Sequence, residues 1–283
     1  MGPKTEFAGI EKLKSAERPQ PDAHPPIECR WISCDSSKFL LYTTESCSSS
    51  MDVAWRLSNE RSFPDWASVL SATQFSGRGQ FGRTWKSPPG NVYGTVRIPR
   101  LGPAWSDLQP LLLAETVRGL LENLGLPAAI KWPNDLIVDG KKVGGILLET
   151  RSDIVMAGLG LNLSSAPQPH DLRHPLAQPA GYLGEFGVWC TPMEIWVSFI
   201  HEAHRLIQHL HLLGDPERFV DSLTPRLAYI GESILLDAYA EGRQPALYLG
   251  VDAGGAIKVL TSEGERIFRS GSIYPMMQRH KGN

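Results

Sequence analysis

A stretch of nine residues, GRGQFGRTW at positions 77–85, limits what this part of the chain can fold into. Three glycines in nine residues disfavour both a helix and a regular strand, so we predict a loop. The sequences on either side, residues 66–74 and 90–99, favour strands because apolar and β-branched residues recur in them. The loop therefore joins two strands and carries two arginines and a tryptophan.

The residue types in this loop indicate a ligand that is anionic at one end and aromatic at the other. Glycines let backbone N–H groups approach a ligand closely. Arg78 and Arg83 offer forked donors suited to carboxylate or phosphate, and Trp85 offers a flat face to an aromatic base. The combination suits a nucleotide or an acyl-adenylate. The alternative is a glycine-rich surface turn whose arginines are solvated.

The chain around the loop alternates between predicted helices and strands. Helices are expected over residues 49–57, 106–125 and 191–213, with a capping residue before each. These caps are Ser49 or Ser50, then Ser106, then Thr191 with Pro192 and Glu194. Residues 128–150 predict two strands around a turn at 139–140, and residues 153–164 predict another strand.

The two ends of the chain differ from this middle part. Residues 1–30 are polar and rich in proline, so we expect a flexible tail that is too short to be a DNA-binding helix-turn-helix domain. Residues 226–283 contain short strands separated by turns at 241–242, 254–255 and 263–264, which predict a small β-barrel. We therefore expect a tail (1–30), a main domain (31–225) and a C-terminal barrel (226–283).

Composition argues against several classes of protein. The net charge of −2 argues against non-specific binding to nucleic acid or an anionic membrane. No apolar stretch approaches the roughly 20 residues that cross a bilayer, and the N-terminus lacks the apolar core of a secretion signal. The spacing of the four cysteines matches neither a disulfide framework nor a zinc site, so we expect reduced thiols in the cytoplasm: Cys29, Cys34, Cys47 and Cys190.

The third predicted helix contains four histidines, and they raise the question of a metal site. His201 and His204 have the i, i+3 spacing that could hold a metal, whereas the surrounding sequence suggests no third ligand. We therefore interpret these histidines as ordinary residues of the helix face.

A second polar stretch, KWPND at 131–135 followed by KKVGGILLE at 141–149, offers cations to an anionic ligand. Lys131 and Lys142 lie on neighbouring strands of one predicted hairpin. Asn134 can bind a base or ribose, and Asp135 can orient a lysine or help to hold Mg²⁺. Gly144 leaves space for a ligand against the strand. The alternative is an exposed hairpin with solvated lysines.

Together with a third stretch, GLGLNL at 158–163, these motifs resemble the biotin–protein ligase family. They match its GRGxxGRxW loop, its KWPND strand and its KxGGIL strand, and the predicted barrel resembles its SH3-like C-terminal domain. The resemblance covers roughly residues 31–273. It implies an α+β fold in which a mixed β-sheet is flanked by helices, as in class II aminoacyl-tRNA synthetases and lipoate ligases.

The resemblance also implies roles for individual residues. It places biotin against Ser49, Ser50, Gln74, Gly77, Arg78, Gly79, Lys142 and Gly144. It places the nucleotide against Gln80, Arg83, Trp85, Lys131, Asn134 and Asn162. Lys142 and Arg78 are the expected catalytic cations, and Asp135 is the expected Mg²⁺ ligand. One departure stands out, because the family commonly has arginine where this chain has Gln80.

The activity implied is ATP-dependent biotinylation of a biotin carboxyl carrier protein or domain, such as that of acetyl-CoA or pyruvate carboxylase. ATP and Mg²⁺ act as co-substrate and metal, biotin is the substrate, and no tightly bound cofactor is expected. Nucleic acid and membrane are not expected partners, and the oligomeric state is open between a monomer and a homodimer.

Two other functions remain open from the sequence. A lipoate or octanoate ligase would use the same adenylation on a linear acid, although the tryptophan-ended loop and the barrel favour biotin. A protein that binds biotin or its adenylate without transferring it is the second alternative. Against it, both lysines and Asp135 are present.

Overall fold

The computed structural model describes residues 10–11, 27–34, 37–60, 63–171, 178–238 and 241–276. Packing divides the chain into two compact units. The first comprises Met1–Arg100, Val143–Pro167 and Gly181–Ile207. The second comprises Leu101–Lys142, Gln168–Ala180 and Gln208–Asn283. Both units are therefore built from segments that are distant in sequence.

A mixed β-sheet forms the centre of the first unit, and its described strands follow the order β1-β2-β3-β4-β5-β9-β8. Strands β3 and β4 are parallel, and the other neighbouring pairs are antiparallel. The expected mixed sheet is thus confirmed. The strands are β1 (Ile10–Glu11), β2 (Glu28–Cys34), β3 (Ser37–Cys47), β4 (Ser68–Gln74), β5 (Val92–Ile98), β8 (Lys141–Arg151) and β9 (Ile154–Leu161).

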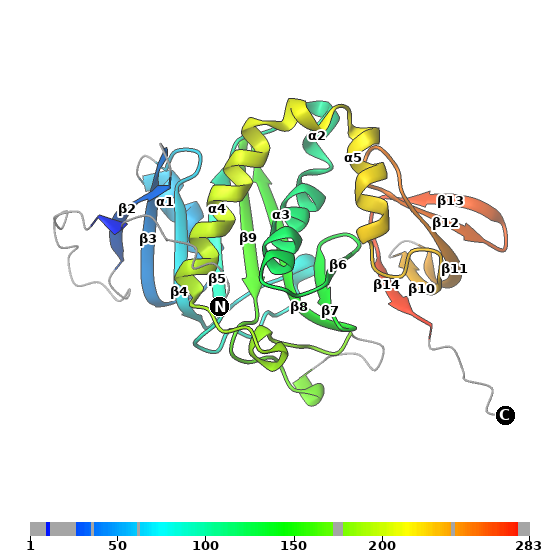
Figure 1. Cartoon of the computed structure of the whole chain (residues 1–283), viewed down its shortest axis with the longest axis horizontal. Helices are drawn as coiled ribbons and strands as arrows, with labels where there is room; N and C mark the ends of the chain where they lie inside the picture. The colour runs from blue at the N-terminus through cyan, green and yellow to red at the C-terminus, as the bar shows by residue number, and fades with distance from the viewer. Residues whose placement is uncertain are drawn as a thin grey trace. The chain divides into compact units, whose positions relative to one another are not determined.

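Helices α1 (Ser50–Glu60) and α4 (Pro192–Gln208) cover opposite faces of this sheet. The hydroxyl of Ser50 in α1 lies 2.9 Å from that of Thr95 in β5. The ring of Trp196 in α4 lies over the neighbouring Gly94, where an added Cβ would come within 2.4 Å of it. Consecutive strand residues face opposite sides. Both faces of β5 are therefore buried, and Figure 1 shows α4 crossing in front of the sheet.

Side-chain caps begin both helices as the sequence predicts. The Ser49 hydroxyl accepts a hydrogen bond from the backbone N–H of Asp52, which makes Ser49 the cap of α1. Thr191 and Glu194 form the expected reciprocal capping box of α4. Helix α4 ends at Gln208, five residues before the expected end, and a 3₁₀ turn, η4 (Leu210–Leu213), follows it.

The second unit contains helices α2 (Pro103–Ser106), α3 (Gln109–Asn123) and α5 (Pro216–Leu223) and a hairpin of β6 (Ala128–Lys131) and β7 (Asp135–Val138). The prediction that Ser106 caps a long helix is wrong. Ser106 ends α2, and α3 starts after Leu108 without a side-chain cap. Pro103 and Pro110 each stand in a first helical turn, where a missing N–H costs nothing. Gly125, with φ +83°, ends α3 as expected.

A five-stranded antiparallel sheet forms the C-terminal part of the second unit, in the order β13-β12-β11-β10-β14. The strands are β10 (Ser233–Ala238), β11 (Gly242–Val251), β12 (Ile257–Thr261), β13 (Gly264–Phe268) and β14 (Ser272–Pro275). Gly242, Gly255 and Gly264 take the positive φ angles that the predicted turns require. The sheet fits the expected SH3-like domain.

Three parts of the chain differ from the sequence-based expectations. Residues 10–11 and 28–30, expected in the tail, lie in β1 and β2. Strands β2 and β3 form a hairpin that was not predicted from the sequence. Residues 128–150 form three strands, because a turn containing the cis Trp132–Pro133 bond separates β6 from β7. The remaining 3₁₀ turns are η1 (Gln80–Gly82), η2 (Pro169–Asp171), η3 (Leu183–Phe186) and η5 (Thr224–Arg226).

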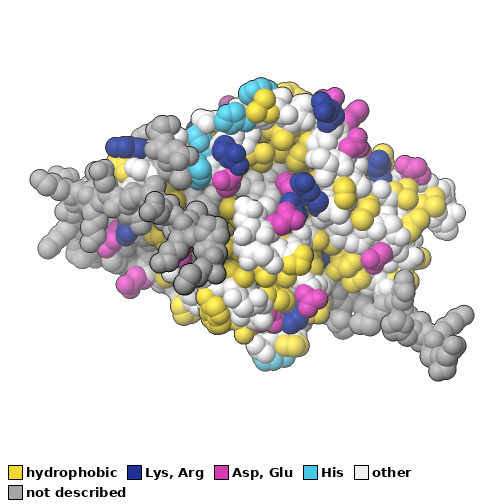
Figure 2. All heavy atoms as spheres, viewed as in Figure 1, with side chains coloured by type: hydrophobic (Ala, Val, Ile, Leu, Met, Phe, Trp, Pro, Cys, Tyr) yellow, Lys and Arg dark blue, Asp and Glu magenta, His cyan; other side chains and the backbone are white. Residues whose placement is uncertain are grey.

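The surface shows mixed charge, in keeping with the net charge of −2. Figure 2 shows Lys and Arg side chains interspersed with Asp and Glu side chains on one face. Across the described ranges, every helix is too short or too polar to span a lipid bilayer.

Candidate active site

The glycine loop folds back on itself as a tight hairpin after β4. The backbone N–H of Gly79 donates to the carbonyl of Arg83 at 2.7 Å, and that of Trp85 donates to Gly77 at 2.8 Å. At the tip, Phe81 and Gly82 have positive φ angles of 57° and 68°. The loop therefore turns within η1 and brings Trp85 back to its base.

Gly77 lies at this base, where there is no room for a side chain. An added Cβ would stand 2.5 Å from the Trp85 carbonyl, 2.7 Å from the Ser87 hydroxyl and 2.9 Å from Nε2 of Gln74. At Gly79 the nearest atom would be 3.7 Å away, so that position tolerates a side chain. The first glycine of the motif is thus required by close packing.

The serines at the start of α1 and Gln74 at the end of β4 form one polar cluster. Gln74 accepts a hydrogen bond from the backbone N–H of Ser50 at 2.7 Å and donates to the Ser87 hydroxyl at 2.9 Å. Both Ser49 and Ser50 are buried. The structure thus brings together the side chains that were predicted to surround biotin on this side, and it fixes the orientation of the Gln74 amide.

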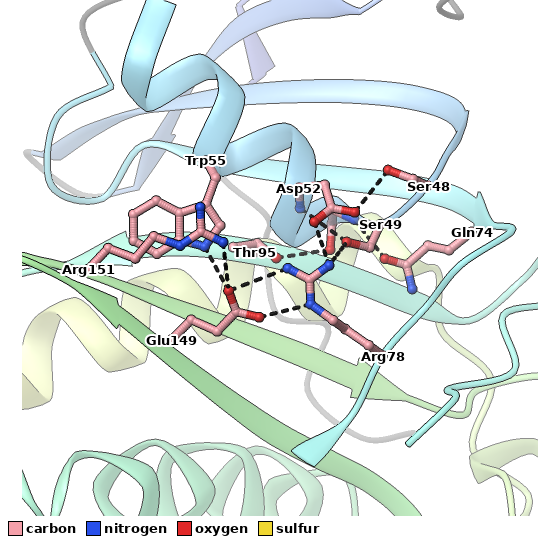
Figure 3. A network of polar contacts seen from close by, with 10 residues as sticks. Ser48, Ser49, Asp52, Trp55, Gln74, Arg78, Thr95, Glu149 and Arg151 are labelled. Carbon is pink, nitrogen blue, oxygen red and sulfur yellow. Dashed lines mark hydrogen bonds and ion pairs between the residues drawn. The ribbon is translucent and has the colours of Figure 1, made fainter. Parts of the chain in front are cut away.

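Arg78 extends from the loop into this cluster and bonds two carboxylates (Figure 3). Its Nε donates to Oε1 of Glu149 at 2.9 Å, and its Nη2 donates to Oε2 at 3.4 Å. Its Nη1 donates to a carboxylate oxygen of Asp52 and to the Ser49 hydroxyl, the latter at 3.3 Å. Arg78 is therefore ion-paired from α1 and from β8 at once.

These ion pairs change the acidity of all three groups. Burial alone would raise the pKa of the Asp52 carboxyl, but hydrogen bonds and charge from Arg78 outweigh it and lower that pKa. The pKa of Glu149 is also lowered, because bonds from Arg78 and Trp55 outweigh the effect of burial. The bond to Glu149 raises the pKa of Arg78 despite its partial burial. All three groups are thus held in their charged forms.

The indole of Trp85 lies against the backbone of β9 at Gly160. An added Cβ at Gly160 would stand 2.6 Å from Cε2 of the indole, so only glycine leaves room for the ring there. Asn162, two residues further, is buried and donates from Nδ2 to the Gly181 carbonyl at 2.9 Å. Trp85 and Asn162, both predicted to contact the nucleotide, therefore lie at Gly160 and two residues after it.

The other loop residues predicted to contact the nucleotide lie toward the tip of the hairpin. Gln80 belongs to η1, and Arg83 is exposed with its guanidinium 5.7 Å from the centre of the Phe81 ring. Gly144 lies in β8, where it pairs with Leu161 of β9. None of these positions is joined to the Arg78 network by the bonds described above.

The second unit holds the other group of predicted site residues. Asp135, at the start of β7, forms ion pairs with two lysines. Its Oδ1 lies 2.6 Å from Nζ of Lys142, and its Oδ2 lies 3.5 Å from Nζ of Lys131. Burial alone would raise the pKa of Asp135, but the two lysines overcome that effect and lower it. Asn134 is buried in the turn beside them.

Hydrogen bonds to other parts of the second unit hold the turn between Lys131 and Asp135, and the strand that carries Lys142, in place. Trp132 is buried, and its Nε1 donates to the carbonyl of Gly255 at 2.8 Å. The backbone N–H of Lys142 donates to the carbonyl of Pro179 at 2.7 Å. The apolar Trp132 therefore stabilises the turn that joins Lys131 to Asp135.

The donor set around Asp135 does not suit Mg²⁺, which prefers oxygen ligands in octahedral geometry. Each oxygen of Asp135 already faces a lysine ammonium group. In the described ranges, no cluster of three His, Cys, Asp or Glu side chains is close enough to hold a metal ion. The geometry instead supports the other role considered for Asp135, which is to orient the lysines.

The residues that hold Arg78 were not predicted from the sequence. Asp52, Glu149 and Trp55 were not among the predicted site residues, although Glu149 ends the KKVGGILLE stretch. The available signal was an acidic residue near the end of a glycine-containing strand that was already suspected of binding a ligand. The combined action of Arg78 and Lys142 stays a prediction, because each belongs to a different unit.

Comparison with known proteins places these residues in context. Residues 44–163 match the model of the biotin/lipoate A/B protein ligase family. A biotin–[acetyl-CoA-carboxylase] ligase of Paracoccus denitrificans is 31% identical over 218 residues, which are 73% of this chain and 89% of the relative.

Solved structures show the same similarity. A biotin protein ligase from Aquifex aeolicus in complex with biotin and ATP superposes with a TM-score of 0.69 at 24% identity, covering 84% of this chain and 99% of the other. A biotin protein ligase from Leishmania major in complex with biotinyl-5-AMP superposes with a TM-score of 0.61 at 25% identity, covering 87% of this chain and 100% of the other.

Proposed function

The chain belongs to the family of biotin–protein ligases, and from this premise we propose how its residues divide the work of the reaction. The protein is an ATP-dependent enzyme that adenylates biotin and transfers it to a carrier protein. The observation that carries the residue assignments is the cluster in which Arg78 of the glycine loop meets Ser49, with Ser50 and Gln74 adjoining.

The first step joins two anions. A carboxylate oxygen of biotin attacks the α-phosphorus of ATP, a new P–O bond forms, and the bond to pyrophosphate breaks. Repulsion between the carboxylate and the triphosphate opposes this approach, so cations are needed that also stabilise charge in the transition state. We assign this task to Arg78 and Lys142, and the contacts of Lys142 with Asp135 support an oriented ammonium group.

The second step consumes the reactive mixed anhydride. The ε-amine of a carrier lysine attacks the acyl carbon of biotinyl-5′-AMP, an amide bond forms, and AMP leaves while the amine proton passes to solvent. The anhydride is also open to attack by water, so a covering loop protects it. The hairpin of residues 77–85 is suited to this task because Arg78 ties it to Glu149 of β8.

The nucleotide assignments have different degrees of structural support. For Trp85, the support is an indole packed against Gly160, and for Asn162 it is a buried side chain two residues after that glycine. Lys131 and Asn134 share one turn with Asp135, which supports a common task there. Gln80 and Arg83 rest on the sequence motif alone, as does the assignment of Gly79 to biotin.

Partners and location complete the proposal. The relative from Paracoccus denitrificans is named for acetyl-CoA carboxylase, so we propose a biotin carboxyl carrier domain as the acceptor. We place the reaction in the cytoplasm, in line with three cysteines that are free thiols in the described part of the chain: Cys29, Cys47 and Cys190. Mg²⁺ enters this account as the companion of ATP, and no step is assigned to a metal held by Asp135.

One assay tests the function and its alternatives. The protein is incubated with ATP, Mg²⁺, a carrier domain and either labelled biotin or labelled lipoate. We expect pyrophosphate release and carrier labelling with biotin. Labelling with lipoate instead would indicate a lipoate ligase, and binding of biotin without pyrophosphate release would indicate a non-catalytic protein.

Substitution of Lys142 tests the residue assignment. Loss of one donor to a developing oxyanion lowers such rates by about 10²–10³-fold, so Lys142→Ala should slow formation of biotinyl-5′-AMP by that amount. Lys141→Ala is the matched control, since Lys141 precedes it on the same strand and faces the other side. Equal adenylation rates in the two variants would contradict the assignment.

A further inference from the structure

Arg78 has few donors left for a ligand. A guanidinium carries five N–H groups. Glu149, Asp52 and Ser49 take four of them, and the fifth, on Nη2, has no partner among the described residues (Figure 3). One free donor cannot give the two parallel bonds by which arginine holds a carboxylate or a phosphate. A bound oxyanion must therefore replace one of the existing partners.

Glu149 is the partner that is held more firmly. It bonds Arg78 through both of its oxygens, and its Oε2 also accepts from Nε1 of Trp55 at 2.9 Å. Arg151 lies 3.5 Å from the same oxygen and stacks over the Trp55 ring at 4.2 Å. The Glu149 side chain is only 23% exposed. Moving it would break several bonds at once.

Asp52 is the partner that is easier to replace. It bonds Arg78 through Nη1 alone, and its side chain is 41% exposed. Its other oxygen accepts from the Ser48 hydroxyl at 3.0 Å, and that bond can persist when Arg78 leaves. Its release would free an Nη1 N–H beside the unused Nη2 N–H, which makes the pair of donors that an oxyanion needs.

The charges lead to the same conclusion. Arg78 and Arg151 balance Asp52 and Glu149, so the network of Figure 3 is close to neutral. An oxyanion added to it would meet two carboxylates and repulsion, whereas an oxyanion that takes the place of Asp52 leaves the charge around Arg78 unchanged. Exchange is therefore the less costly way for an anion to reach this arginine.

We propose that the Asp52 carboxylate occupies the anion-binding end of Arg78 until an oxyanion of the reaction displaces it, while Glu149 positions the guanidinium throughout. This inference rests on the proposed function, in which Arg78 serves the carboxylate of biotin and the α-phosphate of ATP. Asp52 then sets the affinity for these groups, because each must compete with it.

The variant Asp52→Asn tests this competition. It removes the negative charge and keeps the shape and an oxygen that accepts from Arg78. We expect the dissociation constant of biotin or of ATP, measured by calorimetry, to fall about threefold to tenfold, the range of a charge-assisted bond in a partly exposed site. Binding of biotinamide or of adenosine, which lack the negative charge, should stay unchanged.

Comparing biotin with biotinamide, and ATP with adenosine, identifies which anion displaces Asp52 from Arg78. A change for biotin but not for biotinamide indicates the carboxylate, and a change for ATP but not for adenosine indicates the phosphate. Glu149→Gln should instead weaken binding of the same anion, since the guanidinium loses its fixed orientation. A merely structural role for Asp52 would move the charged and neutral ligands together.

The chain supplies a closely matched control. Arg97 and Asp65 form another Arg–Asp pair in the first unit, with side chains 28% and 44% exposed, against 29% and 41% for Arg78 and Asp52. Asp65→Asn should leave all four ligands unaffected. If the unmodified protein makes no biotinyl-5′-AMP, the proposed function fails. If it does and Asp52→Asn tightens neither biotin nor ATP, only this inference is overturned.

Discussion

The contact between Gly160 and Trp85 gives a prediction whose size can be worked out from distances. In Gly160→Ala the new methyl carbon would stand 2.6 Å from Cε2, 2.8 Å from Cζ2 and 2.9 Å from Nε1 of the indole. Unstrained carbon contacts lie near 3.5–4.0 Å, so the ring must retreat by about 1 Å. The backbone at Gly160 has a negative φ and accepts alanine, and the strain therefore falls on the ring.

The displaced ring should stack poorly on adenine. Stacking of a base on an aromatic side chain is worth about 1–3 kcal/mol, and about 1.4 kcal/mol corresponds to tenfold in affinity. We expect the KM for ATP to rise at least about fivefold, while the KM for biotin stays within about twofold, since no biotin contact is altered. The measurement is pyrophosphate release at varied ATP and at varied biotin.

Two further variants separate a nucleotide effect from a general loss of structure. In Gly158→Ala, on the same strand, the nearest atom to the new methyl is the flexible end of Met51 at 3.2 Å, so the KM for ATP should barely change. In a Trp85→Ala background, Gly160→Ala should add no further loss. An unchanged KM for ATP in Gly160→Ala, with an unchanged melting temperature, would refute the reasoning.

Two more predictions concern stability. Because the two lysines depress the pKa of Asp135 below its usual value near 3.8, the stability it supplies is present above that value and is lost as pH falls through the lower folded pKa. Asp135→Asn should therefore lower the free energy of unfolding at pH 7 by about 3 kcal/mol and flatten its decline at pH values below the usual pKa of the carboxyl. Urea titrations at several pH values measure this, and an equally steep decline would contradict it. Gly119 lies inside α3 with no atom within 4 Å of an added Cβ, so Gly119→Ala should raise the free energy of unfolding by about 0.5–1 kcal/mol, and a lower melting temperature would count against it.

The features that the sequence predicted well depend on neighbouring residues. The turn at 139–140 follows from two residues that adopt positive φ, 46° at Asp139 and 69° at Gly140, which Asp-Gly sequences favour. The cap of α4 follows from Thr191 and Glu194, three residues apart. The chemistry of neighbouring residues is therefore enough to predict these elements.

The features that were missed depend on distant residues. The partners of Arg78 come from 26 residues before it and 71 residues after it, and no local pattern links them. Ser106 has the composition of a helix cap, yet Pro103 starts a shorter helix in front of it. The hairpin of β2 and β3 went unnoticed because hydroxyl and charged residues interrupt its alternation.

Ser49 has a consequence for anyone who wishes to redesign the acid that this enzyme accepts. Its one oxygen begins helix α1 by accepting from Asp52 and also accepts from Arg78, so its own hydrogen is what remains to point elsewhere. A library randomised at this codon would select first for chains that still fold, which favours threonine, aspartate and asparagine, the other residues that cap a helix through a side-chain oxygen. Changes of substrate range are better sought at Gln74, whose replacement removes one bond to the backbone N–H of Ser50 but leaves the Ser49 cap in place.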